Sequence, residues 1–169
     1  MDTTQSPRCR RCGDCCRNGG PALHSDDLDC FHGPDGLGME HLITLRRGEM
    51  VRDQPTSSIV ALDEEILKIR GKENSSICLF FQANPAGCSI YERRPAECRA
   101  LSCSDPAPLK AMYKQDRLTR SDLLPEGHPL LELVDEHDHR CDPTELGRLC
   151  QQVLESQDQD VINVIGGML

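Results

Sequence analysis

The stretch Cys9-Arg10-Arg11-Cys12-Gly13-Asp14-Cys15-Cys16, near the start of the chain, decides how the fold is held together. A Cys-x2-Cys spacing lets two thiolates converge on one metal ion while backbone N–H groups of the turn point at sulfur. Gly13 directly follows the second cysteine and suits the tight turn that this arrangement requires. The adjacent thiols of Cys15 and Cys16 point to different sides of the backbone. Both therefore reach one multi-atom cluster, or two metals, more easily than a single tetrahedral ion.

A second group of four cysteines lies further along the chain, and the two groups together supply eight thiols. Eight thiols suffice for two four-thiolate zinc ions, for two clusters, or for one cluster with a spare dithiol. Thiolates select soft or borderline metals, which are zinc, Fe–S clusters and cuprous copper. The predicted metal ligands are Cys9, Cys12, Cys15, Cys16, Cys78, Cys88, Cys98 and Cys103.

Two other interpretations of these cysteines compete with bound metal. Free cysteine is often buried, but eight in two compact runs are unusual for a chain in which only 3% of residues are aromatic. A disulfide network is disfavoured by the odd total of eleven cysteines, by the adjacent pair and by the lack of a secretory signal. Bound metal is therefore the prediction.

The charge and hydropathy of the chain exclude several classes of partner. Nineteen Lys and Arg against 28 Asp and Glu give a net charge of −9, so the basic field that nucleic acid requires is missing. No apolar run approaches the roughly 20 residues that span a membrane, and the first residues lack the apolar stretch of a secretory signal. We expect a cytoplasmic protein that binds neither nucleic acid nor membrane.

The sequence predicts a small α+β fold that is irregular and rich in loops. Residues 42–45 form a short apolar element, and a β-hairpin is predicted from strands at 65–70 and 77–81. Ser25 is a fair N-cap for a short acidic helix. A further helix is predicted over residues 92–101, with Pro95 in its first turn.

The C-terminal third is predicted to be helical. One helix starts near Pro129, and a second follows the N-cap, proline and glutamate of residues 142–145. The second helix carries an apolar stripe that includes Cys150, which is therefore expected in the core. The prolines near residue 105 divide the prediction into a metal-binding domain, residues 1–105, and a helical extension packed on it, residues 106–169.

Two motifs together resemble a known family. Cys9-x2-Cys12-Gly-x-Cys15-Cys16 and the later run Gly87-Cys88-Ser-Ile-Tyr91-Glu-x-Arg94-Pro95-x-x-Cys98-Arg99 resemble the CxxCxxCC cysteine-cluster family, the YkgJ-like zinc- or iron-chelating proteins. The resemblance covers about residues 8–103. It implies binding of zinc, iron or an Fe–S cluster, without a defined reaction for most members. The much larger flagellin lysine N-methylases are a more distant resemblance.

Three residues near the second motif are candidates for tuning the centre. Tyr91, Arg94 and Arg99 lie close in sequence to Cys88 and Cys98, where cationic groups would offset the charge of bound thiolates and lower the thiol pKa values. The alternative is ion pairing with neighbouring glutamates on the surface, which stabilises little.

Three other residues could add ligands or hydrogen bonds. His24 either supports the centre or caps the helix at Ser25. His137 and Cys141 are four residues apart on one helical face, which suits metal chelation, although a solvated helix end is the simpler reading. The sequence assigns no role to Cys30.

Three functions follow from the sequence. The first is a metal-binding protein with an Fe–S cluster ([4Fe–4S] type) or Zn²⁺, acting in redox chemistry or electron transfer with a redox or protein partner. The second is a zinc-stabilised structural or protein-interaction module without catalysis. The third is a cluster-containing enzyme distantly related to protein lysine methylases, which would need a cofactor pocket. The sequence carries no motif for nucleotide binding or hydrolysis, and it leaves the oligomeric state open.

Overall fold

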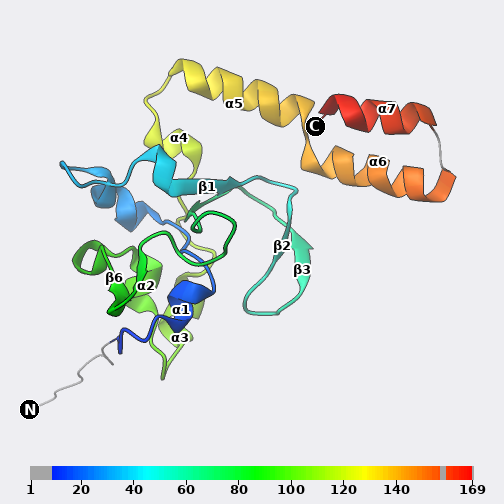
Figure 1. Ribbon diagram of the computed structural model, residues 1–169. Coiled ribbons are helices and arrows are strands. Elements are labelled where there is room, and N and C mark those ends of the chain that lie inside the picture. Colours follow the sequence, from blue (N-terminus) through cyan, green and yellow to red (C-terminus); the bar gives the residue numbers. More distant parts are fainter. Residues whose placement is uncertain (1–8, 157–158, 169) are drawn as a thin grey trace, which may run out of the picture. The chain divides into compact units, whose positions relative to one another are not determined.

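The structure is a computed structural model that describes residues 9–156 and 159–168 (Figure 1). The chain divides into two compact units. The first unit comprises residues 1–44 and 66–119, and the second comprises residues 45–65 and 120–169. Helices and short antiparallel strand pairs occur together between long loops, so the predicted class, a small and loop-rich α+β fold, is confirmed.

The first unit is built from short elements, because its sequence is interrupted by turns and prolines. Its only regular pairings among the described residues join two strands at a time. In chain order the elements are α1 (Asp14–Arg17), η1 (Ser25–Phe31), η2 (Met39–His41), β1 (Leu42–Leu45), β4 (Ile66–Ile69), β5 (Phe81–Ala83), β6 (Ala86–Cys88), η3 (Tyr91–Arg93), α2 (Ala96–Ala100) and α3 (Ala107–Met112).

The core of the first unit is centred on β4, which pairs with β1. Leu67 of β4 is almost fully buried, as are Leu23 and Leu118 beside it. The backbone links the three leucines, since Leu23 N donates to Leu67 O at 2.9 Å and Leu118 N donates to Leu23 O at 2.9 Å. Burial of each leucine stabilises the fold by about 1.5–3 kcal/mol. This core supports the loops that carry the cysteines.

The predicted strands at 42–45 and 65–70 are confirmed as β1 and β4, but the predicted hairpin partner at 77–81 is wrong. A single bridge joins Gly71 to Cys78, and β4 pairs with β1 instead. The physical reason is that a longer ladder needs the N–H of Arg70 opposite Leu79, and this N–H donates to His41 O at 2.9 Å instead. Phe81 N donates to Cys78 O at 3.0 Å, which turns the segment away from β4. The hairpin of this region is β5–β6, in which Phe81 lies opposite Cys88.

The helix predicted over residues 92–101 is broken in two, as η3 and α2. Arg94 lies between them in an extended conformation, with φ −63° and ψ 144°. A residue before proline is excluded from the helical region by the proline ring, so Pro95 ends one segment and precedes the next. The predicted helix after Ser25 is the 3-10 helix η1, and its N-cap is His24 rather than Ser25.

The described part of the second unit contains one strand pair and four helices. β2 (Met50–Arg52) and β3 (Ile59–Ala61) pair antiparallel, with Val51 opposite Val60. The helices are α4 (Arg120–Leu123), α5 (Pro129–Arg140), α6 (Pro143–Ser156) and α7 (Gln159–Met168), and α6 packs along α7 (Figure 1). No helix within residues 9–156 and 159–168 is long and apolar enough to cross a membrane.

Helix α6 starts at the N-cap that the sequence predicts. Its buried face includes fewer residues than the predicted apolar stripe. Asp142 Oδ1 accepts the N–H of Thr144 at 2.8 Å, as expected of an N-cap. Leu149 is buried, whereas the neighbouring Cys150 is exposed. The expectation that Cys150 belongs to the core is therefore wrong. Successive helical residues point about 100° apart, so a helix packed on one side buries Leu149 and leaves Cys150 in solvent.

Candidate metal centre

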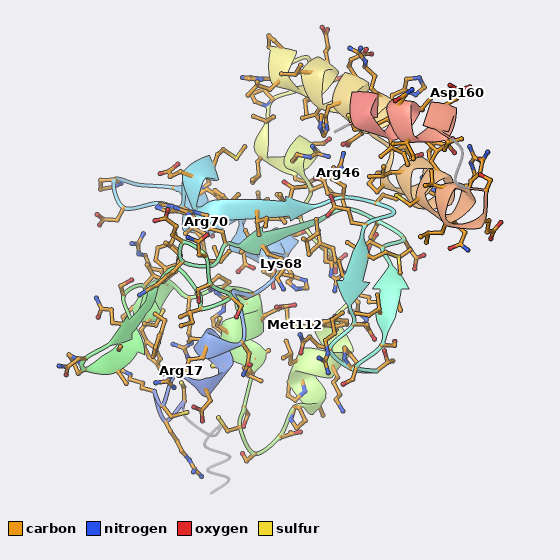
Figure 2. All side chains as sticks on the ribbon, turned by 45° about the vertical axis from the view of Figure 1, so that its right-hand side comes forward. Arg17, Arg46, Lys68, Arg70, Met112 and Asp160 are labelled. Atoms are coloured by element: carbon orange, nitrogen blue, oxygen red, sulfur yellow. The ribbon has the colours of Figure 1, made fainter. Side chains whose placement is uncertain are left out.

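The N-terminal cysteine motif is folded against the segment that carries Cys78. Gly13 has a left-handed backbone with φ +81° and leads into α1. Cys16 O accepts the N–H of Cys78 at 2.7 Å, which joins the two cysteine groups through their backbones. Arg17, the last residue of α1, lies over the ring of Phe81 with 4.8 Å from its guanidinium carbon to the ring centroid (Figure 2).

Gly13 is required at this junction for two reasons. Only glycine adopts its positive φ without strain, and a Cβ at this position would overlap the ring of Phe81. We expect Gly13→Ala to lower the free energy of unfolding by about 2–4 kcal/mol, because backbone strain and overpacking add. Chemical denaturation would measure this loss. Gly33→Ala is the matched control for φ alone, since Gly33 has φ +86° with nothing within 4 Å of its added Cβ. Equal losses in the two variants would contradict the role of Phe81.

Six of the eight predicted ligands line one cavity of the first unit. Gly13, Gly87, Arg11 and Tyr91 complete its wall. The cavity thus gathers thiols that are distant in the sequence, because β5–β6 and η3 bring the second motif to the first. The six cysteines are Cys9, Cys12, Cys15, Cys16, Cys88 and Cys103.

The other two predicted ligands, Cys78 and Cys98, lie close to the same thiols. Burial raises the pKa of Cys98 well above its ordinary value, and the charges of four nearby cysteines add to this effect. Those charges come from Cys15, Cys16 and Cys88 as well as Cys78. The structure therefore brings all eight predicted cysteines into one region of the first unit.

Backbone N–H groups point at three of these sulfurs. Arg11 N lies 3.4 Å from Cys9 Sγ and donates to it. Cys78 accepts the N–H of Phe80, and Cys88 accepts the N–H of Ile90. In each case the donor is two residues after the cysteine, which is the turn predicted for a thiolate ligand. Such donors stabilise the thiolate form before a metal arrives.

Burial and mutual repulsion act against the thiolates in the metal-free protein. Burial raises the pKa of Cys16 to about 12, with a further contribution from Cys15, whose sulfur is 3.8 Å away. Burial also raises the pKa of Cys78. A bound cation removes both penalties, because it neutralises the thiolates and holds them in place of their protons.

Arginine side chains surround one side of the centre. Arg11 and Arg94 each lie with the guanidinium carbon 4.0 Å from the ring centroid of Tyr91. Burial raises the pKa of Cys88, while the N–H of Ile90 and the charge of Arg94 oppose that rise. Arg94 Nε is buried and has no hydrogen-bond partner among the described residues. An anionic thiolate centre offers the acceptor and the negative charge that this group lacks.

Two of the other candidates near the centre make different contacts. Arg99 pairs with Asp27 at 3.6 Å rather than with a neighbouring glutamate. His24 is buried, with Nδ1 2.7 Å from Gln115 O and Nε2 3.4 Å from Glu97 Oε1. Both ring nitrogens of His24 therefore face oxygen atoms. His24 is linked to the centre through Glu97, the residue directly before Cys98.

The remaining cysteines and histidines do not line this cavity. Cys30 lines a separate small pocket with Arg93. His137 and Cys141 belong to the second unit, where Arg46 Nη1 contacts His137 Nδ1 at 3.4 Å and donates to Cys141 O at 3.0 Å (Figure 2). The backbone carbonyl of Cys141 and the ring of His137 thus both contact Arg46.

The thiols share one region without forming a regular coordination geometry. Within the described part of the chain, no group of three or more Cys, His, Asp or Glu side chains has the arrangement that holds a metal ion. All eleven cysteines are free thiols. The donor set nevertheless fits a soft metal, since eight thiols, three N–H···S donors and an unpartnered arginine N–H meet in one place.

The fold and its cysteine cluster define a small α+β protein of the metal-binding class. The chain belongs to the CxxCxxCC family, described as a "putative zinc- or iron-chelating domain", whose sequence model matches residues 8–142. The match confirms the resemblance seen in the two cysteine motifs and extends to the end of α5. No curated protein and no solved structure matches the chain.

Proposed function

We propose that the eight gathered cysteines hold an Fe–S cluster and that the protein acts in electron transfer or another redox step. The observation that carries this proposal is the position of the adjacent pair. Cys15 and Cys16 line the same cavity, their sulfurs are 3.8 Å apart, and the charges of both act on Cys98. Two adjacent thiols that line the same cavity suit a centre with several metal atoms.

The number of thiols supports the same conclusion. A structural zinc site takes four ligands in a tetrahedron. The cavity alone is lined by six thiols, and Cys78 and Cys98 lie close to them. More than four thiolates in one place favour a polynuclear centre, or two centres, over a single ion.

The exposure of the thiols gives the centre an inner and an outer side. Cys78 is 7% exposed, whereas Cys12 and Cys103 are exposed on the wall of the cavity. An Fe–S cluster bound here supplies reversible one-electron transfer. The inner thiols hold the centre in the protein, and the outer edge gives a redox partner a short path to it.

The surrounding donors also suit a redox centre. Cys9, Cys78 and Cys88 each accept a backbone N–H, and Arg94 places a positive charge beside Cys88. Hydrogen bonds and positive charge at sulfur stabilise the more negative, reduced state of a cluster and raise its reduction potential. These residues therefore set the potential at which one electron enters or leaves.

Metal and acid-labile sulfide content test the proposal directly. We expect protein purified without oxygen to contain iron and sulfide in equal amounts, with visible absorbance that bleaches reversibly when a reductant is added. Stoichiometric zinc without sulfide would replace this proposal with the zinc-stabilised module. A folded protein without metal would overturn both.

A further inference from the structure

Asp27 is a fully buried carboxylate that the sequence did not single out. Its exposed fraction is 0%, and both oxygens accept backbone N–H groups. Oδ2 accepts the N–H of His24 at 3.0 Å, and Oδ1 accepts the N–H of Ala96 at 2.7 Å. Arg99 Nη2 lies 3.6 Å from Oδ1 and supplies the opposite charge. A buried carboxylate with these partners holds in place the segments whose backbone N–H groups donate to it.

The element that donates to Asp27 is the helix carrying Cys98. Ala96 is the first residue of α2, and Pro95 at the N-cap makes no side-chain cap. The N–H groups of a first helical turn have no partner within the helix. Asp27, which is far away in the sequence, supplies that missing acceptor and places its negative charge at the N-terminal end of α2.

Two further contacts hold α2 on either side of Cys98. Glu97 Oε2 accepts the N–H of Ala22 at 2.8 Å, and Arg99 reaches Asp27. Residues 96, 97 and 99 are thus each attached to the segment 22–27 through polar contacts. Cys98 is the residue of this turn that faces the other cysteines, whose charges act on its thiol.

We propose that Asp27 is a positioning residue for the metal centre, because its carboxylate fixes α2 and thereby the place of the Cys98 thiol. This inference rests on the proposed role of Cys98 as a ligand. Residues that orient ligands from outside the coordination sphere typically change metal affinity by about 10–100-fold when they are replaced. Asp27 therefore contributes to metal affinity without touching the metal.

The test uses Co²⁺ bound to the metal-free full-length chain, since thiolate-to-cobalt absorbance reports how many thiolates bind. We expect Asp27→Ala to weaken Co²⁺ binding about tenfold or more and to lower the absorbance per bound ion. Asp27→Asn keeps one acceptor for Ala96 N, so its Co²⁺ affinity should fall between those of Asp27→Ala and the unaltered protein. This conservative variant keeps the test informative if Asp27→Ala does not fold. In the Cys98→Ser background, Asp27→Asn should cause no further loss of affinity.

A core variant separates positioning from general stability. Leu118→Ala removes a buried side chain of the same unit and should lower the unfolding free energy while the absorbance per bound Co²⁺ stays unchanged. Equal affinity losses for Asp27→Asn with and without Cys98, or unchanged absorbance in both Asp27 variants, would overturn the inference. If the unaltered chain binds no Co²⁺ through thiolates, the proposed function itself fails, which is a different outcome.

Discussion

Cys98→Ser is expected to remove most of the bound metal and to destabilise the protein at the same time. The charges of Cys78, Cys16, Cys15 and Cys88 all act on the Cys98 thiol, so its loss removes a thiol that is close to four others. Metal binding free energy is largely folding free energy in small thiolate sites. We expect at least a tenfold fall in metal content per chain. A loss of about 3 kcal/mol would lower Tm by about 6–12 °C.

Elemental analysis and thermal unfolding of the same preparations check this result. Cys150→Ser is the matched control, because Cys150 is an exposed thiol on α6 in the second unit. It should leave metal content and Tm unchanged. Cys141→Ser provides a second control, since Cys141 follows α5 and lies outside the thiol cavity. Equal losses in all three variants would contradict the assignment of the eight cysteines.

The second large effect is expected when pH is changed. A metal ion displaces the thiol protons, so raised pKa values make protons stronger competitors. The pKa of Cys16 is raised to about 12, mainly by burial, and those of Cys78 and Cys98 are raised for the same reason. Apparent metal affinity should therefore rise steeply with pH. Its limit is about one decade per pH unit for each thiol proton released.

The metal-free protein should respond to pH with the opposite sign. Above a pH of about 9 the thiols ionise in the unfolded chain, while the folded chain holds the Cys16 proton up to about 12. Fewer protons are then bound in the unfolded state, so the free energy of unfolding should fall as pH rises through this window. Zn²⁺ competition titrations and denaturant unfolding of the metal-free chain measure the two slopes. Affinity that does not change with pH would show that thiols are not the ligands.

The turn of the first cysteine group could be predicted because it depends on local spacing. The run from Cys9 to Cys16 forms its own turn around Gly13, and the N–H of Arg11 points at Cys9 as the spacing requires. Asp27 could not be found in this way. Its partner Ala96 lies 69 residues away, and its local role as the N3 residue that accepts the N–H of the N-cap is hidden when the cap is placed at Ser25 instead of His24. Only the folded chain shows that this carboxylate is buried.

The errors in the predicted elements also have long-range causes. The segment 77–81 has strand composition, but the Arg70 N–H that a longer ladder needs is donated to His41, the residue before β1. Cys150 follows an apolar stripe, yet the face that α6 buries is too narrow to include it. Propensity and periodicity describe one segment at a time, and in both cases the partner segment decides the outcome.

The pairing of β1 with β4 has a consequence for how this architecture can vary in evolution. The excursion of residues 45–65 leaves the first unit at the end of β1 and returns at the start of β4. Because these two strands are held side by side, the ends of the excursion are fixed whatever lies between them. The entropic cost of a longer loop grows only slowly with its length. Insertions and deletions between the two strands can therefore accumulate while the spacing of the thiols is preserved.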